Sequence, residues 1–403
     1  MKNLIVVHKY GGTSLKEPEQ LRNCAENIRR EYHQGLRPVV VVSAMGRTGD
    51  PYATDTFLGL ADSISANPAV RELDLLMACG ELVSATLLAV QLQELGCAAM
   101  ALTGSQAGII TNNNFGSAEI LAVEIKRIRQ VVESGKIPVI CGFQGVTEAG
   151  ELTTLGRGGS DITAVAVAAA LKLDTATIYT DVPAVKTADP KLVQNALPIY
   201  SLSYQEVLEM AVEGARVIHP RAVERAMADD IRLIITSLAN GNNPPTEIGP
   251  RRGQPRPEKE TIRAITYLTG IIQFQIGLAP ENLAELLEEM AGNGISLDLI
   301  YLSDSKHSFT VQEKFADGVE EILARRNIRA TRKNNCCKIS LIGVGIKGMS
   351  GVMTRVYRPL TEKKIPVYYT SDSYTQIAVL IPEMYLAEAV NCLHQVFFGE
   401  DGR

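Results

Sequence analysis

The sequence predicts an α/β fold, in which helices cover a mostly parallel sheet, followed by two smaller βαββα units. Three observations lead to this prediction. Over residues 1–240, short and continuously apolar runs alternate with helical segments, which is typical of parallel strands buried on both faces. A stretch rich in proline and glycine then follows. Beyond it, the same order of strands and helices occurs twice, as in ferredoxin-like domains.

Length and composition set the broad class of the protein. A chain of 403 residues requires more than one domain. We predict an α/β domain at residues 1–240, a linker at 241–261, and the two small units at 262–335 and 336–403. The net charge of −5 offers no basic surface for nucleic acid.

Two features of the sequence indicate the cellular compartment of the protein. No signal peptide is recognisable and no apolar run reaches the roughly 18 residues of a membrane span, so we expect no membrane partner and a cytoplasmic location. The seven cysteines have no regular spacing. They are interpreted as free thiols in a reducing compartment rather than as disulfides or zinc ligands.

Strands of the α/β domain end in polar or glycine-containing turns. The first strand, Asn3 to His8, runs into Lys9-Tyr10-Gly11-Gly12-Thr13-Ser14. Further strands are expected at Val39–Val42, Ala98–Leu102, Ile137–Cys141, Ala176–Tyr179 and Ile231–Ile235. Helices are expected at Pro18–Gln34, Glu81–Leu95 and Ala118–Ser134. Such alternation favours a parallel sheet with right-handed crossovers.

Polar residues gather just after the strands, at the edge where open α/β sheets bind ligands. We therefore expect one crevice to bring together Lys9, Ser43, Ser105, Gln144, Thr180 and Asp181. Lys9 has two interpretations: it neutralises a transferring phosphoryl group, or it is a strand-terminal lysine that reaches solvent. The glycines that follow it favour the first, because they let backbone approach a ligand closely.

A second glycine loop lies in Thr153–Leu171, which reads TTLGRGGSDITAVAVAAAL. Ser160 and Asp161 suit the start of a helix, and the uncharged run that follows predicts a buried one. A glycine loop before such a helix predicts phosphate chemistry. Arg157 suits a bidentate grip on a carboxylate. Glu81 either complements the dipole of its helix or binds a substrate ammonium, and in the second case it and Arg157 together would recognise an amino acid.

Other nucleotide motifs are absent or incomplete. No G-x-x-x-x-G-K-[ST] run is present, which excludes a P-loop site. Residues 343–348 (GVGIKG) match G-x-G-x-x-G, and Asp372 follows where a ribose-binding acid would stand. The remaining tail is too short for a dinucleotide fold, so we reject NAD binding. His219, before a proline, is interpreted as structural.

Both small units read βαββα. The first has expected elements at Ile262–Leu278, Glu281–Ala291, Gly294–Leu302, His307–Gln312 and Asp317–Arg325. The second has them at Lys338–Val344, Val352–Lys363, Pro366–Thr370, Gln376–Ile381 and Met384–Phe397. A tandem of this kind predicts a duplicated regulatory domain, and the last segment could pack back on the first unit.

Six motifs in order and at matching spacing resemble the aspartate kinases. They are KYGGTS (9–14), VVSAMG (41–46), CGE (79–81), TLGRGGSD (154–161), TDVPAVKTADP (180–190) and EGARVIHPRAVE (213–224). The tandem tail resembles the paired ACT domains of these enzymes. SAMGRTGDPYATD (43–55) and AVNCLHQVF (389–397) are similar to the diaminopimelate-sensitive aspartokinase I type.

The resemblance implies an amino-acid-kinase three-layer αβα sandwich that phosphorylates the β-carboxylate of L-aspartate with ATP and Mg²⁺. This is the first step toward lysine, diaminopimelate, threonine and methionine. The implied catalytic residues are Lys9 and Asp161. The implied aspartate-binding residues are Ser43, Thr48, Glu81, Arg157 and Ser160. The implied nucleotide-binding residues are Lys9, Gly11, Gly12, Thr13, Ser14, Thr180, Asp181, Lys186, Asp189, Lys191 and Arg216. No protein ligands of a metal are predicted.

The resemblance also implies feedback control by diaminopimelate, lysine or threonine, and a homodimer or homotetramer formed through the ACT domains. The candidate effector contacts are Gly277, Asn282, Ile295, Ser296, Gly345, Gly351, Ile365 and Val367. Tyr10, Ala184, Lys186 and Arg216 depart from the usual family residues; Tyr10 should be harmless, whereas the other three keep open an amino-acid-sensing protein with a lapsed kinase. A kinase of another amino-acid carboxylate is a further alternative.

Overall fold

The computed structural model describes residues 4–215, 217–239, 244–250, 262–303, 306–343, 345–346 and 351–399. The chain divides into two compact units. The first comprises Met1–Val185, Pro198–Ala211 and Arg216–Gln254. The second comprises Lys186–Leu197, Val212–Ala215 and Pro255–Arg403. Two short segments from the middle of the chain thus pack with its C-terminal part.

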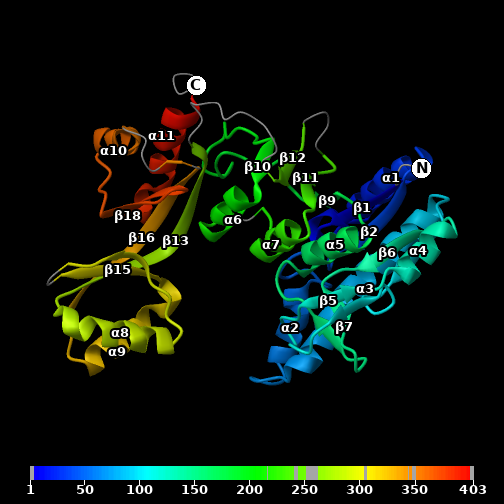
Figure 1. The fold of residues 1–403 in the computed structure, drawn as a ribbon, viewed down its shortest axis with the longest axis horizontal. Helices are drawn as coiled ribbons and strands as arrows, with labels where there is room; N and C mark the ends of the chain where they lie inside the picture. Colours follow the sequence, from blue (N-terminus) through cyan, green and yellow to red (C-terminus); the bar gives the residue numbers. More distant parts are fainter. Residues whose placement is uncertain are drawn as a thin grey trace. The chain divides into compact units, whose positions relative to one another are not determined.

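An eight-stranded sheet forms the centre of the first unit (Figure 1). Its order is β10-β12-β11-β9-β1-β2-β6-β3, and all pairs are parallel except β11 with β12. The strands are β1 (Ile5–Tyr10), β2 (Arg37–Val42), β3 (Ala99–Leu102), β6 (Ile137–Cys141), β9 (Thr175–Tyr179), β10 (Ser201–Ser203), β11 (Arg232–Thr236) and β12 (Thr246–Gly249). The predicted mostly parallel α/β sheet is confirmed.

Helices pack on both faces of this sheet. α1 and α3 share a core with it that includes Ile28, Val40, Leu88 and Val139. α5 packs on β1, β2 and β9 and against α7. The helices of the unit are α1 (Pro18–His33), α2 (Thr54–Asp62), α3 (Val70–Glu94), α4 (Lys126–Glu133), α5 (Gly159–Ala170), α6 (Tyr204–Val212) and α7 (Pro220–Ala228), with the short 3₁₀ helix η1 (Gly12–Ser14).

A small four-stranded sheet lies in the same unit. Its order is β5-β4-β7-β8. The strands are β4 (Ile109–Thr111), β5 (Ile120–Val123), β7 (Gln144–Val146) and β8 (Leu152–Thr154). β8 leads directly into the glycine loop before α5, so this sheet positions the loop.

The second unit contains one six-stranded antiparallel sheet, in the order β14-β15-β13-β16-β18-β17. Its strands are β13 (Ile262–Ile276), β14 (Asp298–Tyr301), β15 (His307–Gln312), β16 (Ala330–Gly343), β17 (Tyr369–Asp372) and β18 (Gln376–Pro382). Its helices are α8 (Pro280–Gly292), α9 (Ala316–Arg325), α10 (Val352–Glu362) and α11 (Leu386–Phe398), with the 3₁₀ helices η2 (Glu313–Phe315) and η3 (Glu383–Tyr385).

The two βαββα units share their long strands. The second half of β13 pairs with β15, whereas its first half pairs with residues 338–343 of β16. β16 in turn pairs with β18. Because β13 and β16 run through both halves of the sheet, each half contains four strand segments and two helices. The start of β13 belongs with the second half. The proposed boundary near residue 335 falls within the single strand β16.

Several expected elements differ from those observed. The stretch 241–261 was expected to be a linker, but Thr246–Gly249 within it forms β12, which pairs with β10 and β11. With one apolar residue in four, this strand carries no alternating pattern that the sequence could show. The expected helix Ala118–Ser134 is instead β5 followed by α4, because the short apolar run at 120–123 pairs with β4. α3 begins at Val70, eleven residues before the expected Glu81.

α3 also bears on the expected absence of membrane spans. Among the residues that the structure describes, it is the one helix long and apolar enough to cross a membrane by length and composition. Asp74, Glu81 and Ser84 on this helix are buried inside the unit. Charged side chains that point into a packed core, beside α1 and the sheet, identify α3 as a core helix of this fold.

Candidate functional site

Three neighbouring parallel strands end at one edge of the first unit. Lys9 lies in β1, where it pairs with Val41 of β2 on one side and Ile178 of β9 on the other. Ser43 follows β2, and Thr180 follows β9. The parallel register therefore places all three side-chain positions at the same carboxyl edge, where open α/β sheets bind ligands.

Lys9 and Asp161 form the ion pair at the centre of this edge. Lys9 Nζ lies 2.7 Å from Asp161 Oδ1, and the two side chains are 11% and 12% exposed. Asp161 stands in the first turn of α5, where a carboxylate complements the helix dipole. The two predicted catalytic residues, 152 positions apart in sequence, are thus brought together in a largely desolvated pair.

The loop after β1 packs closely against the loop after β2. Gly46 N donates to Gly12 O at 3.0 Å. A Cβ at Gly12 would lie 2.3 Å from Ala44 O, which leaves room only for glycine. A Cβ at Gly11 would lie 3.7 Å from Lys9 Nζ, so the glycine keeps the space beside the ammonium open. Thr13 and Ser14 lie in η1.

Glu81 projects from α3 into the same region. Its Oε1 accepts a hydrogen bond from Ala44 N at 2.8 Å. The side chain is buried, and within the described part of the chain no donor reaches Oε2. Burial raises the pKa of Glu81 to about 8, although the Ala44 hydrogen bond and the Lys9 charge act in the opposite direction. In its ionised form, Glu81 would offer an incoming cation an open acceptor atom at Oε2.

The Arg157 loop is shaped by close packing on α7. Gly158 has φ = 75°, and a Cβ there would lie 2.3 Å from His219 Cβ. His219 is the N-cap of α7 and accepts from Arg221 N at 3.3 Å. Burial and the nearby Arg221 lower the pKa of His219. His219 therefore has the structural role expected of it, while Arg157 itself is exposed at the loop.

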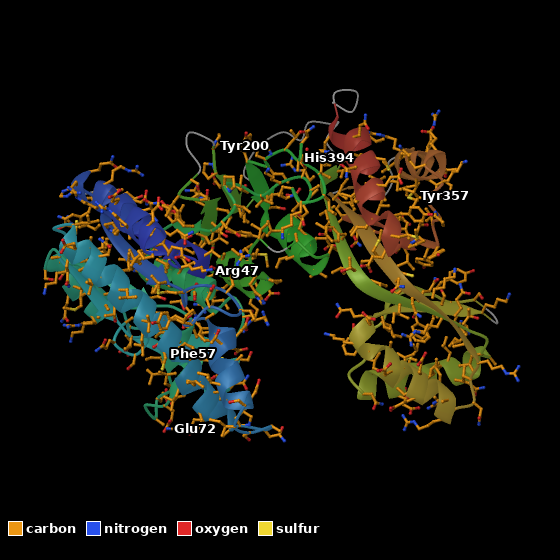
Figure 2. The ribbon with its side chains drawn as sticks, turned by 180° about the vertical axis from the view of Figure 1, so that it is seen from behind. Arg47, Phe57, Glu72, Tyr200, Tyr357 and His394 are labelled. Carbon is orange, nitrogen blue, oxygen red and sulfur yellow. The ribbon has the colours of Figure 1, made fainter. Side chains whose placement is uncertain are left out.

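Ser160 is buried at the start of α5 and packs on the backbone after β6. A Cβ at Gly142 would lie 2.7 Å from Ser160 Cβ. Thr48, in the loop after β2, donates to Asp55 at the start of α2, so its hydroxyl already has a partner. Figure 2 labels Arg47, the neighbour of Thr48, and Phe57 on α2.

Sequence reasoning missed Arg47 as a site residue. Its guanidinium pairs with Asp181 at 2.5 Å, although both side chains are more than half exposed. Thr180 Oγ1 donates to the other oxygen of Asp181 at 3.1 Å. The loops after β2 and β9 are thus joined across β1. The sequence did contain a signal for Arg47: it is the basic residue of the SAMGRTG motif (43–49), which directly follows a buried strand.

The expected convergence was wrong for Gln144. Its side chain is buried: Nε2 donates to Ala78 O at 3.1 Å, and Oε1 accepts from Gly104 N at 3.4 Å. Both the amide nitrogen and the amide oxygen are hydrogen-bonded to backbone atoms, so the Gln144 side chain is not available to a ligand. Ser105 follows β3, which is the edge strand, three places from β1 in the sheet.

The remaining nucleotide-binding predictions fall elsewhere. Lys186, Asp189 and Lys191 belong to the second unit. Asp189 Oδ1 accepts from Lys191 N at 2.9 Å and its Oδ2 from the Tyr267 hydroxyl at 2.9 Å. Ala184 is buried in the first unit. Arg216 lies outside the described residues.

The candidate effector positions lie at the ends of helices and strands in the second unit. Gly277 and Asn282 flank the start of α8, and Ile295 and Ser296 precede β14. The corresponding positions of the other half are Gly345 and Gly351 before α10, and Ile365 and Val367 before β17. Ile295 and Ile365 are buried, whereas Asn282 and Ser296 are exposed. They occupy matching places in the two βαββα units.

The chemistry of the donor set fits a nucleotide better than a metal cage. Among the residues that the structure describes, no group of three or more His, Cys, Asp or Glu side chains could hold a metal ion. The edge instead offers an ammonium, glycine-lined backbone and a buried carboxylate with a free acceptor atom. A magnesium ion in such a site is bound mainly by the phosphates of its nucleotide.

Comparison with known proteins agrees with this geometry. The amino acid kinase family matches residues 4–237, and an ACT domain matches residues 331–395. Aspartokinase 1 of Bacillus subtilis is 37% identical over 398 residues, covering 98% of each chain. The chain belongs to the aspartokinase family. The aspartokinase of Geobacillus stearothermophilus is 38% identical over 403 residues, covering 98% of this chain and 97% of that one.

Solved aspartokinases share the fold. Aspartokinase III of E. coli, solved with aspartate and ADP, has a TM-score of 0.75 at 24% identity, covering 97% of this chain and 99% of that one. The aspartate kinase of Clostridium acetobutylicum has a TM-score of 0.77 at 20% identity, covering 98% and 100%. These likenesses confirm the predicted fold class. Aspartokinases 1 and 2 of B. subtilis are 37% and 36% identical, so the subtype stays a prediction.

Proposed function

We propose that this chain transfers the γ-phosphoryl group of ATP to the β-carboxylate of L-aspartate, as an aspartate kinase. The observation that carries the proposal is the Lys9–Asp161 ion pair of 2.7 Å at the carboxyl edge of a parallel sheet. Glycine loops lie on either side of the pair. Membership of the aspartokinase family, at 37–38% identity over nearly the whole chain, supports the same reaction.

The reaction needs alignment and charge neutralisation more than proton transfer. A carboxylate with a reference pKa near 4 is already ionised at neutral pH, so the nucleophile needs no general base. Lys9 stands where its ammonium would neutralise negative charge on the transferring phosphoryl group. Asp161 orients Lys9 through the ion pair, and so acts on the position of the charge.

The aspartate-binding side is assigned to Glu81 and Arg157, with Ser43, Thr48 and Ser160 around them. The open Oε2 of Glu81 suits the α-ammonium of the substrate. Arg157, on an exposed loop fixed by Gly158, suits a carboxylate of the substrate through a two-point contact. A site that holds both an ammonium and a carboxylate selects an amino acid over a simple dicarboxylic acid.

The nucleotide side is assigned to the loop after β1 and the loop after β9. Gly11 leaves space beside Lys9 for phosphate, Gly12 allows the close packing of this loop on the loop after β2, and Thr180 and Asp181 are assigned to the same side. Lys186, Asp189, Lys191 and Arg216 are proposed along ATP on family resemblance alone. ATP and Mg²⁺ are the proposed cofactors, and the bound magnesium ion neutralises phosphate charge.

Regulation is assigned to the second unit, with diaminopimelate, lysine or threonine as effector. The matching positions before α8 and α10 and before β14 and β17 support a contact on each βαββα half. β14 and β17 are the two edge strands of the six-stranded sheet. Ile300 and Tyr301 of β14, and Tyr368 just before β17, are exposed, and the Tyr369 hydroxyl of β17 donates to Ile300 O of β14 at 3.2 Å. Such edges favour pairing with a second copy, so we propose a homodimer or homotetramer. A cytoplasmic location stays a prediction.

An assay of ADP release with ATP, Mg²⁺ and L-aspartate tests the proposal. Parallel reactions with L-glutamate and N-acetyl-L-glutamate test the alternative of another carboxylate substrate. Turnover with aspartate is expected, and turnover with either alternative alone would contradict the proposal. Aspartate binding by calorimetry without phosphoryl transfer in a single-turnover reaction would favour the lapsed kinase instead. Inhibition titrations with the three effectors identify the regulator.

A further inference from the structure

A second carboxylate on α3 is buried away from the reacting atoms. Asp74 has 0% of its surface exposed. The backbone N–H of Gly116 lies 3.0 and 2.9 Å from its two oxygens. Thr154 donates to it twice, from N at 2.8 Å and from Oγ1 at 2.6 Å. One side chain thus joins α3 to two segments that lie 42 and 80 residues further along the chain.

The segment held by Asp74 is the entry to the Arg157 loop. Thr154 is the last residue of β8, and its carbonyl accepts from Ala118 N at 2.9 Å. The next residue, Leu155, donates to Phe143 O at 2.8 Å and accepts from Arg221 Nη1 at 2.5 Å. Hydrogen bonds therefore hold the loop entry to Asp74 of α3, to the backbone of Ala118 and Phe143, and to Arg221 of α7.

The same helix also carries Glu81. Asp74 and Glu81 are seven residues apart, two helical turns, so they project from one face of α3. One rigid helix then determines the position of the Glu81 carboxylate directly and that of the Arg157 guanidinium through Thr154. These are the two groups assigned to the ammonium and a carboxylate of the amino-acid substrate.

We propose that Asp74 is a positioning residue that sets the spacing between Glu81 and Arg157, and so the fit of the amino-acid substrate. The inference rests on the proposed function. A buried carboxylate is costly unless it is fully hydrogen-bonded, and three donors, one from Gly116 before β5 and two from Thr154 at the end of β8, meet that requirement here. Asp74 has no contact with the nucleotide-binding loops among these bonds, so its effect is directed to the amino-acid side.

Replacement of Asp74 by asparagine tests this role. The variant keeps the size of the side chain but turns an amide NH₂ toward backbone N–H groups, leaving at least one buried donor without an acceptor. We expect KM for aspartate to rise about tenfold or more. KM for ATP should stay within about twofold, because the loop after β1 is untouched. Glu72→Gln is the matched control, since Glu72 is exposed on the first turn of the same helix (Figure 2).

Thr154 supplies a milder second pair of variants that keeps the test decisive if Asp74→Asn does not fold. Thr154→Val removes only the hydroxyl donor to Asp74, whereas Thr154→Ser retains it. We expect Thr154→Val to raise KM for aspartate about threefold to tenfold and Thr154→Ser to restore the wild-type value. A merely structural role would change the KM values for aspartate and ATP together, which would overturn the inference.

Hydrogen exchange separates this inference from the proposed function. In the Asp74→Asn or Thr154→Val protein, the backbone amides at positions 116 and 154 should exchange faster than in wild type, with β1 unchanged. If wild-type enzyme shows no turnover with aspartate, the proposed function fails, and the exchange result still judges whether Asp74 fixes the loop. Unchanged exchange at Thr154 together with unchanged KM for aspartate would contradict the positioning role.

Discussion

The Lys9 ammonium lies 2.7 Å from the Asp161 carboxylate, and the two side chains are almost equally shielded from solvent. The pair connects the end of the central strand β1 with the first turn of α5. A charge held in this way needs no reorganisation when negative charge develops near it. The catalytic role of the site depends on this geometry.

Replacement of Asp161 by asparagine should slow turnover far more than it weakens aspartate binding. Lys9 loses its charged partner and its fixed position, and kcat should fall about 100-fold. KM for aspartate should change less than about threefold, because Glu81 and Arg157 are retained. Steady-state kinetics with Asp229→Asn as control, which breaks an ion pair at the end of α7, measure both values. Equal losses in kcat and in aspartate affinity would contradict this role.

Glu81 makes aspartate binding dependent on pH. Its pKa is raised by burial to about 8, so it is mostly protonated in the free protein below that pH. Binding of an ammonium favours the ionised form, so binding should release a proton. Aspartate affinity should rise with pH up to about 8, by as much as about tenfold per unit. Calorimetry in buffers of different ionisation enthalpy measures the released proton.

The same group affects stability in the ligand-free protein. The pKa of an acid raised from 4.5 to about 8 means that the folded state binds more protons than the unfolded state between these values. Stability should therefore decline as pH rises from about 4.5 through about 8. Glu81→Gln should flatten this dependence and abolish proton release. A pH profile identical to wild type in Glu81→Gln would show that another group titrates.

Gly12 should not tolerate a side chain. A Cβ there would lie 2.3 Å from Ala44 O and 2.8 Å from Gly46 O, both of which belong to backbone. Gly12→Ala must displace the loop after β2, and kcat/KM for ATP should fall about 100-fold. Gly59→Ala on α2 is the control, because a Cβ there meets nothing within 4 Å. That control should keep full activity and melt no lower than wild type.

A buried ion cluster should dominate the stability of the second unit. Lys338 Nζ lies 2.9 Å from Glu213 and also pairs with Asp298, while Ser340 Oγ donates to Glu213 at 2.6 Å. Burial lowers the pKa of Lys338, but the bonds to Asp298 and Glu213 outweigh it, so the pKa is raised overall. Lys338→Met leaves Glu213 buried without its cation and should cost about 3–5 kcal/mol.

Two further variants test that explanation by calorimetry. The double variant Lys338→Met with Glu213→Leu removes both charges and should recover most of the loss. Arg358→Gln, which breaks an exposed ion pair on α10, should change the melting temperature little. If Lys338→Met melts like Arg358→Gln, the cluster does not stabilise this unit.

Local signals in the sequence predicted most of the parallel sheet and marked Lys9 and the start of the helix at Ser160 and Asp161, whereas the catalytic role of Asp161 came from the family resemblance and its pairing with Lys9 is seen only in the fold. Lys9 and Asp161 could be found because each stands beside glycines at the end of a strand or the start of a helix. These positions are decided by residues a few places away. The strands β1, β2, β6 and β9 could likewise be predicted, because each contains a short apolar run of neighbouring residues. Their parallel pairing agrees with the right-handed crossover connections expected between them.

Long-range pairing explains what the sequence did not predict. The partner of Asp74 lies 80 residues away and that of Arg47 lies 134 residues away, and no local pattern marks either. The packing of Lys186–Leu197 with the C-terminal unit depends on Ala188, Val193 and Ala196 entering its core. Ordinary surface loops also contain such small apolar residues, so their burial is settled only by the tertiary fold.

The sharing of β13 between the two βαββα halves has the same origin. Its fifteen residues read as one long strand, and only pairing tells which half each segment joins. A register shift between Leu268 and Ile271, around Gly270 with φ = 64°, separates the two pairings. The glycine was visible in the sequence, but its meaning depends on β15 and β16, which follow much later in the chain.

The most direct test of the proposed function is a single-turnover reaction of wild-type protein with [γ-³²P]ATP, Mg²⁺ and L-aspartate, quenched with hydroxylamine. An acyl phosphate reacts with hydroxylamine to give a hydroxamate, so the β-hydroxamate of aspartate should form in step with ADP. Lys9→Met should abolish both products. Formation of ADP without the hydroxamate, or full activity in Lys9→Met, would contradict phosphorylation of aspartate at this site.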